Sequence, residues 1–134
     1  AKINFNIVNG KLNLNNTTFV NNKIGSLRFD NSDLFLDDNE LTLNTDIFIK
    51  IIDTKFLFSF LNTNKKSRNK INNILINLDY NFLTNQIKFN NFVIDNKKVN
   101  DQFLNTLEAF KDSNLENVVR NKRLINRLLS FYEG

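Results

Sequence analysis

Acidic side chains that could do chemistry gather in one short stretch of the chain. Asp37, Asp38 and Glu40 lie close together, and a pair of carboxyl groups can cleave a glycosidic bond as acid and base or nucleophile. Carboxylates also bind calcium, but this stretch lacks the Asp-x-Asp-x-Asp-Gly spacing of a calcium loop. Because Asp and Asn are favoured in turns, we interpret the stretch as a hairpin turn. We predict neither a catalytic residue nor a metal ligand in it.

Other catalytic chemistry finds little support in the composition. The chain contains no His and no Cys, which excludes Ser-His-Asp and Cys-His catalysis and metal ligation by either residue. Its glycines are Gly10, Gly25 and Gly134, and their spacing forms no phosphate-binding loop. We therefore predict no cofactor and no enzyme activity.

Basic side chains are concentrated in one polar stretch near the middle of the chain and in another near its end. The net charge of +4 permits contact with anionic lipid headgroups or nucleic acid without requiring either. Nucleic-acid binding is disfavoured, because no run of Gly and aromatic residues resembles an RNA-binding strand and burial explains most of the Phe residues. The residues that we assign to possible headgroup or partner contacts are Lys65, Lys66, Arg68 and Lys70.

Alternation of apolar and polar residues dominates the part of the chain before residue 100, as in strands with one buried face. Residues 3–7 begin the pattern, and Asn9-Gly10 is a hairpin signal. The acidic turn connects two later strands in the same way. Further strands are predicted over 24–29, 34–36 and 41–51.

Another hairpin is predicted over residues 71–96, with its turn at Thr84-Asn85-Gln86. The two runs contain no reactive side chain, and their apolar residues share one face. We predict that this face either shelters a lipid tail or packs against a helix expected over residues 101–110. Its residues are Ile74, Ile76, Leu78, Tyr80, Phe82, Ile87 and Phe89.

Helical spacing of apolar residues replaces alternation in three places. Residues 53–61 predict a short helix lying on the sheet, and residues 101–110 predict an amphipathic helix. Ser113 to Glu116 is a capping-box pattern, in which the Ser and Glu side chains satisfy free N–H groups at a helix start. It predicts a longer helix whose apolar stripe ends at Tyr132.

These elements predict a single α+β domain over residues 1–134, with one hydrophobic core. We expect a twisted antiparallel β-meander with a groove-like sheet over 1–96, interrupted by the short helix, and a helical tail over 97–134. The 28 Asn residues are attributed to an AT-rich genome. Because the chain starts at Ala1 and has no Met, we expect a C-terminal piece of a longer protein. No stretch approaches the ~20 apolar residues of a membrane span.

Two stretches resemble a known family. Residues 25–51, GSLRFDNSDLFLDDNELTLNTDIFIKI, combine a short strand, Asn-Ser-Asp, an apolar strand, an acidic turn and a long alternating strand. Residues 70–95 show a similar hairpin pattern. Together they resemble the C-terminal region of AsmA-like proteins, the group with TamB and YhdP relatives in Gram-negative envelopes. The likeness spans roughly residues 1–110.

The resemblance implies a non-enzymatic β-groove protein in the periplasm, anchored in the inner membrane by a segment outside this chain. It also implies a role in phospholipid transport or outer-membrane homeostasis, with acyl chains along an apolar sheet face. Two alternatives stay open. The helices could cover that face, or the chain could be a structural or protein-interaction module of the cell envelope without lipid binding. The predicted partners are therefore a lipid or an envelope protein.

Overall fold

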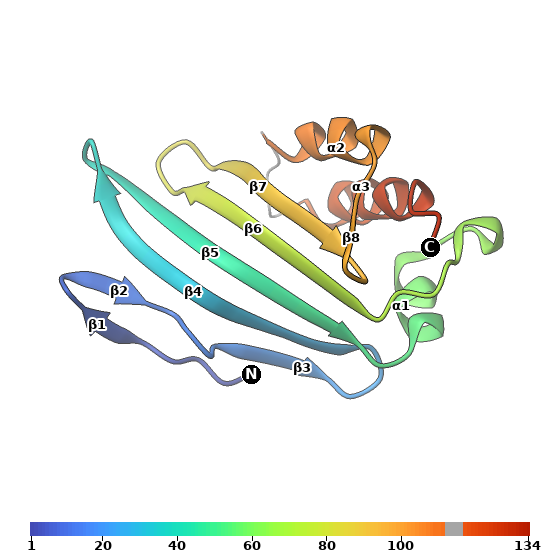
Figure 1. Ribbon diagram of the computed structural model, residues 1–134, viewed down its shortest axis with the longest axis horizontal. Helices are drawn as coiled ribbons and strands as arrows, with labels where there is room; N and C mark the ends of the chain where they lie inside the picture. The colour runs from blue at the N-terminus through green and yellow to red at the C-terminus, as the bar shows by residue number, and fades with distance from the viewer. Residues whose placement is uncertain (112–116) are drawn as a thin grey trace.

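The chain forms a curved sheet with helices on one side (Figure 1). The computed structural model describes residues 1–111 and 117–134. The elements in chain order are β1 (Asn6–Val8), β2 (Lys11–Asn13), β3 (Thr18–Asn21), β4 (Gly25–Asp37), β5 (Glu40–Ile51), α1 (Thr54–Leu61), η1 (Lys65–Ser67), β6 (Asn73–Asn81), β7 (Gln86–Ile94), β8 (Lys97–Lys98), α2 (Asp101–Leu107), η2 (Glu108–Phe110) and α3 (Val118–Ser130).

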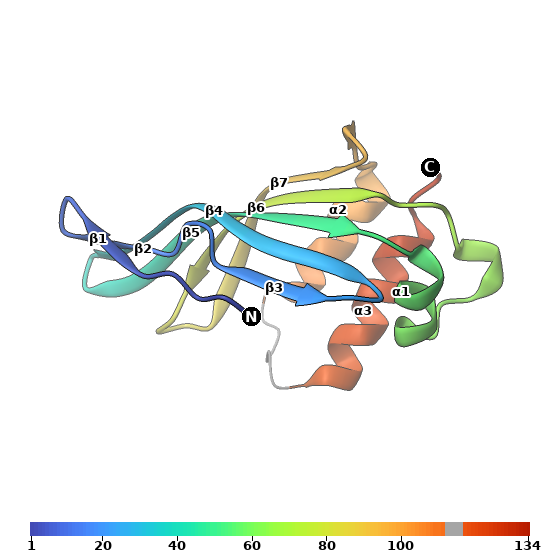
Figure 2. The ribbon, with the colours of Figure 1, turned by 90° about the horizontal axis from the view of Figure 1, so that it is seen from below.

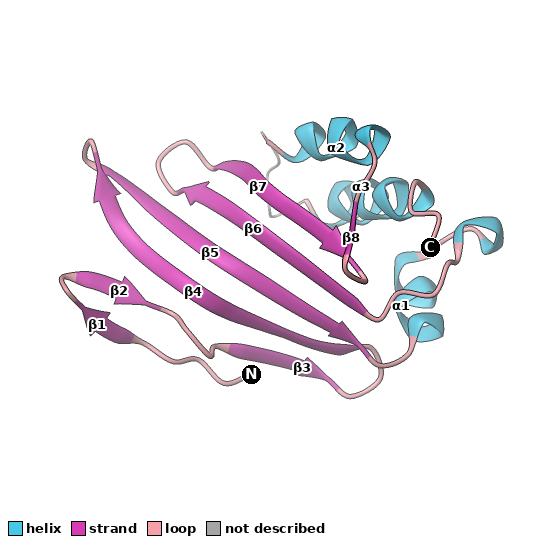
Figure 3. Ribbon diagram, in the orientation of Figure 1, coloured by secondary structure: helices cyan, strands magenta, loops and turns pink. Residues whose placement is uncertain are grey.

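Within the described residues, eight strands form one antiparallel sheet. Their order is β1-β2-β4-β5-β6-β7-β8, and β3 pairs with β4 beyond the end of β2. From β4 onward each strand pairs with the next one along the chain. Figure 3 shows the helices gathered at one end of this sheet. The predicted α+β meander, with one inserted helix and two C-terminal helices, is confirmed.

Asparagine and aspartate residues allow the tight turns of the sheet. Three hairpins have two-residue loops in which both residues have positive φ. Such loops match the twist of the paired strands, and Asn, Asp and Gly adopt this backbone conformation most readily. The loops are Asn9-Gly10, Asp38-Asn39 and Asp95-Asn96. Every described non-glycine residue with positive φ is Asn or Asp, so the asparagine content has a structural use beyond base composition.

Strand β4 corrects the strand prediction. The sequence predicts two strands on either side of Asn31, but the structure has a single strand that bulges there and continues. Asn31 and Ser32 both lie opposite Thr45, and Asn31 has a φ of 47°. The edge strand β3 was not predicted, because its four residues show no clear alternation. This strand is formed by its pairing with β4, although its own sequence does not predict it.

The hydrophobic core lies between one end of the sheet and the three helices (Figure 2). α3 contacts both α1 and α2. The ring of Phe103 in α2 lies 4.8 Å from the ring of Phe92 in β7, measured between centroids. The buried core residues are Ile51, Phe58, Leu61, Ile71, Ile74, Ile94, Phe103, Leu107, Leu128, Leu129 and Tyr132.

Each α-helix begins at a polar side chain that accepts a hydrogen bond from a backbone N–H group of the first turn, a contact worth about 1 kcal/mol. The predicted helices over 53–61 and 101–110 are confirmed, the second as α2 followed by η2. The predicted capping box at 113–116 lies outside the described residues. α3 ends at Ser130, before Tyr132, which is nevertheless buried in the core. The capping residues are Asp53, Asn100 and Asn117.

Candidate apolar binding surface

One face of the sheet is apolar along most of its length. The strand register places Leu34, Leu43 and Tyr80 side by side on β4, β5 and β6. Alternate residues of a strand point to the same face, so the apolar positions of these strands share one surface. Polar residues such as Asn44 and Asp79 occupy the other surface.

Two bulges keep the apolar residues on this face. Along β4 the apolar positions are odd-numbered before the bulge and even-numbered after it, as in Phe29 and Leu34. In β7 the irregularity beside Asn90 has the same effect on Phe92 and Phe89. A slip of one residue reverses the face of every later side chain. Without the extra residue, alternation would place the later apolar residues of each strand on the opposite face. The extra residue therefore keeps them on the apolar face.

The helices cover one part of the predicted surface. Ile74 is buried in the core, and Ile76 and Phe89 pack against the core. The ring of Phe89 also lies 6.2 Å from that of Phe110, at a steep angle. These residues meet the helices, as one of the two sequence-based alternatives predicts.

The remaining predicted residues lie outside the core cluster. Leu78, Tyr80 and Ile87 are half-buried, and Phe82 is exposed. Phe82 lies in the turn after β6, where its ring contacts that of Tyr80 edge-on with centroids 4.7 Å apart. The predicted surface is thus divided between a helix-covered part and an uncovered part.

Strands β4 and β5 extend the uncovered part with residues that the sequence analysis did not assign to it. Their alternation is visible in the sequence, but their common face follows from the pairing of β4 with β5 and from the bulge. Figure 2 shows that this end of the sheet projects beyond the helices. We call this surface the open apolar face; its residues are Leu27, Phe29, Leu34, Leu36, Leu41, Ile47, Leu78, Tyr80 and Phe82, and Leu43 lies buried among them.

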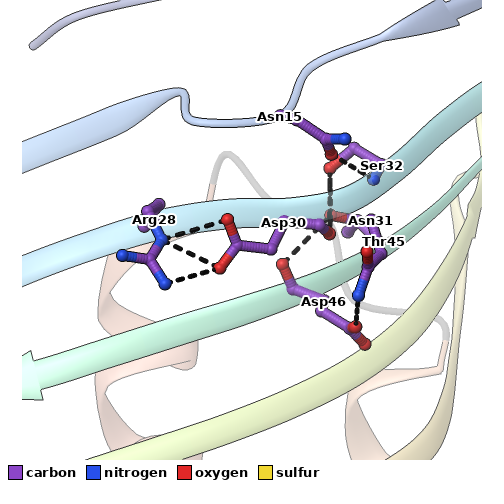
Figure 4. Close-up of polar contacts among 7 residues, drawn as sticks. All are labelled: Asn15, Arg28, Asp30, Asn31, Ser32, Thr45 and Asp46. Atoms are coloured by element: carbon purple, nitrogen blue, oxygen red, sulfur yellow. Dashed lines mark hydrogen bonds and ion pairs between the residues drawn. The ribbon is translucent and has the colours of Figure 1, made fainter.

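Two buried hydroxyl groups lie in the middle of the open apolar face, at the β4 bulge (Figure 4). Ser32 and Thr45 are fully buried, and their hydroxyl oxygens are 2.6 Å apart. The backbone N–H of Ser32 donates to Asn15 Oδ1 at 2.7 Å, which connects β4 to the segment between β2 and β3. Buried polar groups that hydrogen-bond each other do not require water. Because both side chains are fully buried, neither hydroxyl lies on the surface that a ligand would contact.

Carboxylate and amide groups connect the strands on the opposite face. Asp46 accepts hydrogen bonds of 2.7 Å from Asn31 and from Asn77. Asp30 lies directly opposite Asp46, a pairing of like charges that is unfavourable by itself. Arg28 offsets it through an ion pair of 2.8 Å with Asp30 (Figure 4). These carboxylates hold strands together.

The acidic turn has the backbone role that the sequence predicts. Asp38 and Asn39 form the two-residue loop between β4 and β5. The Glu40 carboxylate accepts a hydrogen bond from Asn81 on the neighbouring strand β6. Among the described residues, no group of three or more potential ligands could hold a metal ion.

The basic stretch lies at the helix-bearing end of the sheet. It includes η1 and leads into β6 at Asn73, whereas Leu36 and Leu41 lie at the opposite end of the strands. Figure 1 shows this separation along the length of the sheet. The structure therefore does not bring Lys65, Lys66, Arg68 and Lys70 to the open apolar face.

A cleft of about 480 Å³ lies where β6 and β7 meet the chain at the end of α2. Ile87 contributes an apolar side chain to its wall, and Asp79, Lys88, Glu108 and Lys111 contribute charged ones. Ile87 pairs with Tyr80 across the two strands. The cleft therefore adjoins the open apolar face, and it was not predicted from the sequence because its walls come from distant segments.

The last residues of the chain close the helix-covered end. The Tyr132 hydroxyl donates to Asp95 at 3.3 Å, and the Tyr132 carbonyl accepts from Asn69 at 2.5 Å. Burial, the charge of Asp95 and the hydrogen bond to it raise the pKa of Tyr132 above its usual 10.0. The segment after α3 is thereby joined to the β7–β8 turn and to the loop before β6.

Comparison with protein-family models, curated protein sequences and solved structures finds no match. Within the described ranges, no helix combines the length and apolar character needed to cross a membrane. The family hypothesis thus depends on the sequence resemblance, and inferences about binding depend on the geometry of the sheet.

Proposed function

We propose that the chain is a non-catalytic lipid-binding domain whose open apolar face shelters an acyl chain. The supporting observation is the set of apolar side chains from β4, β5 and β6 that share one face and lie outside the helix-covered core. Uncovered apolar patches mark binding surfaces, because each Å² of apolar area removed from water contributes about 25 cal/mol.

The dimensions of the open apolar face suit a hydrocarbon chain. Leu41 and Ile47 are six positions apart on β5, which is about 20 Å at ~3.3 Å per residue. Three adjacent strands span about 10 Å across. One leaflet of a bilayer is about 15 Å deep in hydrocarbon, half of the ~30 Å core. The length therefore suits a single acyl chain, which would contact Leu41 and Ile47 but not the buried Leu43 and Thr45 between them.

The cleft beside Ile87 offers a place for the polar end of the lipid. Lys88 and Lys111 bring positive charge to its wall, and Asp79 and Glu108 bring negative charge. Lysine binds phosphate as a point charge without strict geometry. In this arrangement the headgroup lies in the cleft and the tail runs from Tyr80 along the open apolar face. The basic stretch around Arg68 has no part in the complex.

From the sequence resemblance, we further propose that the domain belongs to a longer AsmA-like protein of the Gram-negative envelope. That protein would lie in the periplasm, with an inner-membrane anchor outside this chain, and take part in phospholipid transport or outer-membrane homeostasis. Such a role requires no catalytic residue, since shielding an acyl chain from water is a matter of apolar contact. The helix-covered end of the sheet would then mark where the sheltered surface stops.

Lipid analysis of the purified protein tests the proposal. We expect mass spectrometry of an organic extract to show co-purifying phospholipid or fatty acid. A fluorescent fatty acid should bind saturably and be displaced by phospholipid. Absence of both co-purified lipid and saturable binding would contradict the proposal. Salt-dependent association with an envelope protein, without any association with phospholipid vesicles, would favour the protein-interaction alternative.

A further inference from the structure

The two edges of the sheet differ in whether they can pair with a further strand. At the β7 edge, the backbone N–H of Ile87 donates to the carbonyl of Lys111 at 3.3 Å. The short strand β8 pairs with the end of β7, and β7 itself carries Lys88 and the bulge beside Asn90. Charges, bulges and covering segments are the usual protection against edge pairing. This edge is therefore closed.

The opposite edge consists of residues 2–8, which run along β3 and β2 (Figure 1). The backbone N–H and carbonyl of Lys2 both bond to Thr18, at 2.7 Å each. The N–H and carbonyl of Asn4 both bond to the Thr17 hydroxyl, at 3.0 and 3.2 Å. The inward backbone groups of the even-numbered residues are thus occupied by the protein's own sheet.

Among the described residues, no strand pairs with the outward side of the odd-numbered residues of this edge. Backbone groups alternate in direction along a strand, so those of Ile3, Phe5 and Ile7 point away from the sheet. Their side chains are 55%, 63% and 79% exposed, respectively. Ile7 pairs with Leu12, which pairs with Leu34, so these side chains extend the open apolar face. Exposed apolar residues on an unprotected strand are the pattern of an edge that pairs with another chain.

The sequence of the open edge suits pairing with a second copy of the same edge. Residues 3–7 read Ile-Asn-Phe-Asn-Ile in both directions. We propose that two copies of this chain pair through this edge as antiparallel strands, about a two-fold axis at Phe5. Phe5 then lies opposite Phe5 of the second copy, and Ile3 lies opposite Ile7. Every outward N–H and carbonyl of these three residues gains a partner.

The pairing is self-complementary in charge as well as in shape. Lys2 lies opposite Val8 of the second copy, and Asn4 lies opposite Asn6, so no like charges face each other. An interface in which the same patch serves both copies is the usual form of a two-fold dimer. The two sheets become one, with their open apolar faces on the same side. The pairing itself needs no lipid and does not depend on the proposed function.

Sedimentation equilibrium of the 134-residue chain without lipid tests the dimer. We expect a mass of twice 15.7 kDa at high protein concentration. Phe5→Lys and Phe5→Glu each place two like charges opposite each other and should weaken dimerisation about tenfold or more. An equimolar mixture of the two variants should regain the dimer, which also shows that both are folded. Leu83→Lys, at an exposed apolar position in the β6–β7 turn, is the control and should remain dimeric.

A cysteine scan checks the register, since the chain has no Cys of its own. Phe5→Cys should form a disulfide-linked dimer on oxidation, because opposite residues lie within disulfide reach. Ile7→Cys should not, because the two copies of position 7 are about 13 Å apart along the strands. A monomer at all concentrations, a dimer unaffected by Phe5→Lys, or cross-linking at position 7 but not at position 5 would each overturn the proposal.

Discussion

The hydroxyl oxygens of Ser32 and Thr45 lie 2.6 Å apart, and both side chains are fully buried at the bulge of β4. The contact connects Ser32, one of the two bulge residues of β4, to Thr45, the single residue that opposes them on β5. The bulge allows Phe29 and Leu34 to lie on one face despite their odd separation. The hydrogen bond between Ser32 and Thr45 thus belongs to the bulge that keeps the apolar residues of β4 on one face.

Replacing Thr45 by Val tests the role of this pair. The variant keeps the shape of the side chain but removes the closer partner of the buried Ser32 hydroxyl, which retains the Asp30 carbonyl at 3.3 Å. We expect the free energy of unfolding to fall by about 1 kcal/mol. The double variant Ser32→Ala/Thr45→Val should lose less than the sum of the two single changes. Urea unfolding of the four proteins measures the coupling. Strictly additive losses would show that the two hydroxyls act independently.

The bulge is also the place where the sequence-based prediction of two separate strands is wrong. Asn31 and Ser32 are typical turn residues, and so they predict a break that the pairing with β5 overrides. Two hairpin loops, Asn9-Gly10 and the acidic turn, were predicted, because these residues determine their own backbone conformation. The Asp95-Asn96 loop and strand β8 were not predicted, since residues 97–134 were expected to form a helical tail. Local chemistry identified the turns, whereas the continuity of β4 depends on its neighbour.

The sequence also did not predict which part of the apolar surface the helices cover and which part they leave uncovered. The alternation that predicts Ile74 and Tyr80 on one face is the same for both, yet Ile74 is in the core and Tyr80 is outside it. The difference depends on where the helices dock, and docking depends on contacts between distant residues. Asn126 of α3 makes one such set of contacts. Its side-chain amide donates to the carbonyl of Leu61, the last residue of α1, and accepts from the hydroxyl of Thr63 just beyond it.

Asn126→Ala should loosen the docking of α3. The Leu61 carbonyl and the buried Thr63 hydroxyl would lose their partner, which costs about 1–3 kcal/mol. Hydrogen exchange of the α3 amides should accelerate as the helix opens more often. Arg123→Ala, at an exposed position on the same helix, is the matched control. Equal exchange rates in the two variants would show that Asn126 does not hold the helix in place.

Tyr132→Phe should change how stability depends on alkaline pH. The folded state raises the pKa of Tyr132 above 10.0, chiefly through burial. It therefore favours the protonated hydroxyl, and this contribution is complete below pH 10 and is lost as pH rises above that value. Phenylalanine has no such loss. Urea midpoints measured from pH 7 to pH 11 should fall more steeply for the natural protein, and parallel curves would contradict this expectation.

At neutral pH the same variant reports on the closure of the helix-covered end. Loss of the hydrogen bond from Tyr132 to Asp95 should cost about 0.5–1.5 kcal/mol. The variant should bind a fluorescent fatty acid as well as the natural protein does, because Tyr132 is not part of the open apolar face. A large loss of fatty-acid binding would place the ligand at the helix-covered end instead.

Leu41 and Leu75 form a matched pair for testing the binding surface. Both are 38% exposed, but Leu41 lies on the open apolar face and Leu75 on the opposite face. Leu41→Asp places a charge under the proposed acyl chain and should weaken fatty-acid binding about tenfold or more, since a charge in an apolar contact is costly. Leu75→Asp should leave binding nearly unchanged. Equal effects of the two changes would mean that binding does not depend on the face.

Photo-cross-linking at the same two positions shows whether the open apolar face contacts lipid in cells. A benzophenone amino acid replaces Leu41 in one protein and Leu75 in another, and both are irradiated in Gram-negative cells that produce the chain joined to a periplasmic export signal. We expect a phospholipid adduct at position 41, detected by mass spectrometry, and none at position 75. Adducts at neither position, or equally at both, would contradict the claim that the open apolar face shelters lipid.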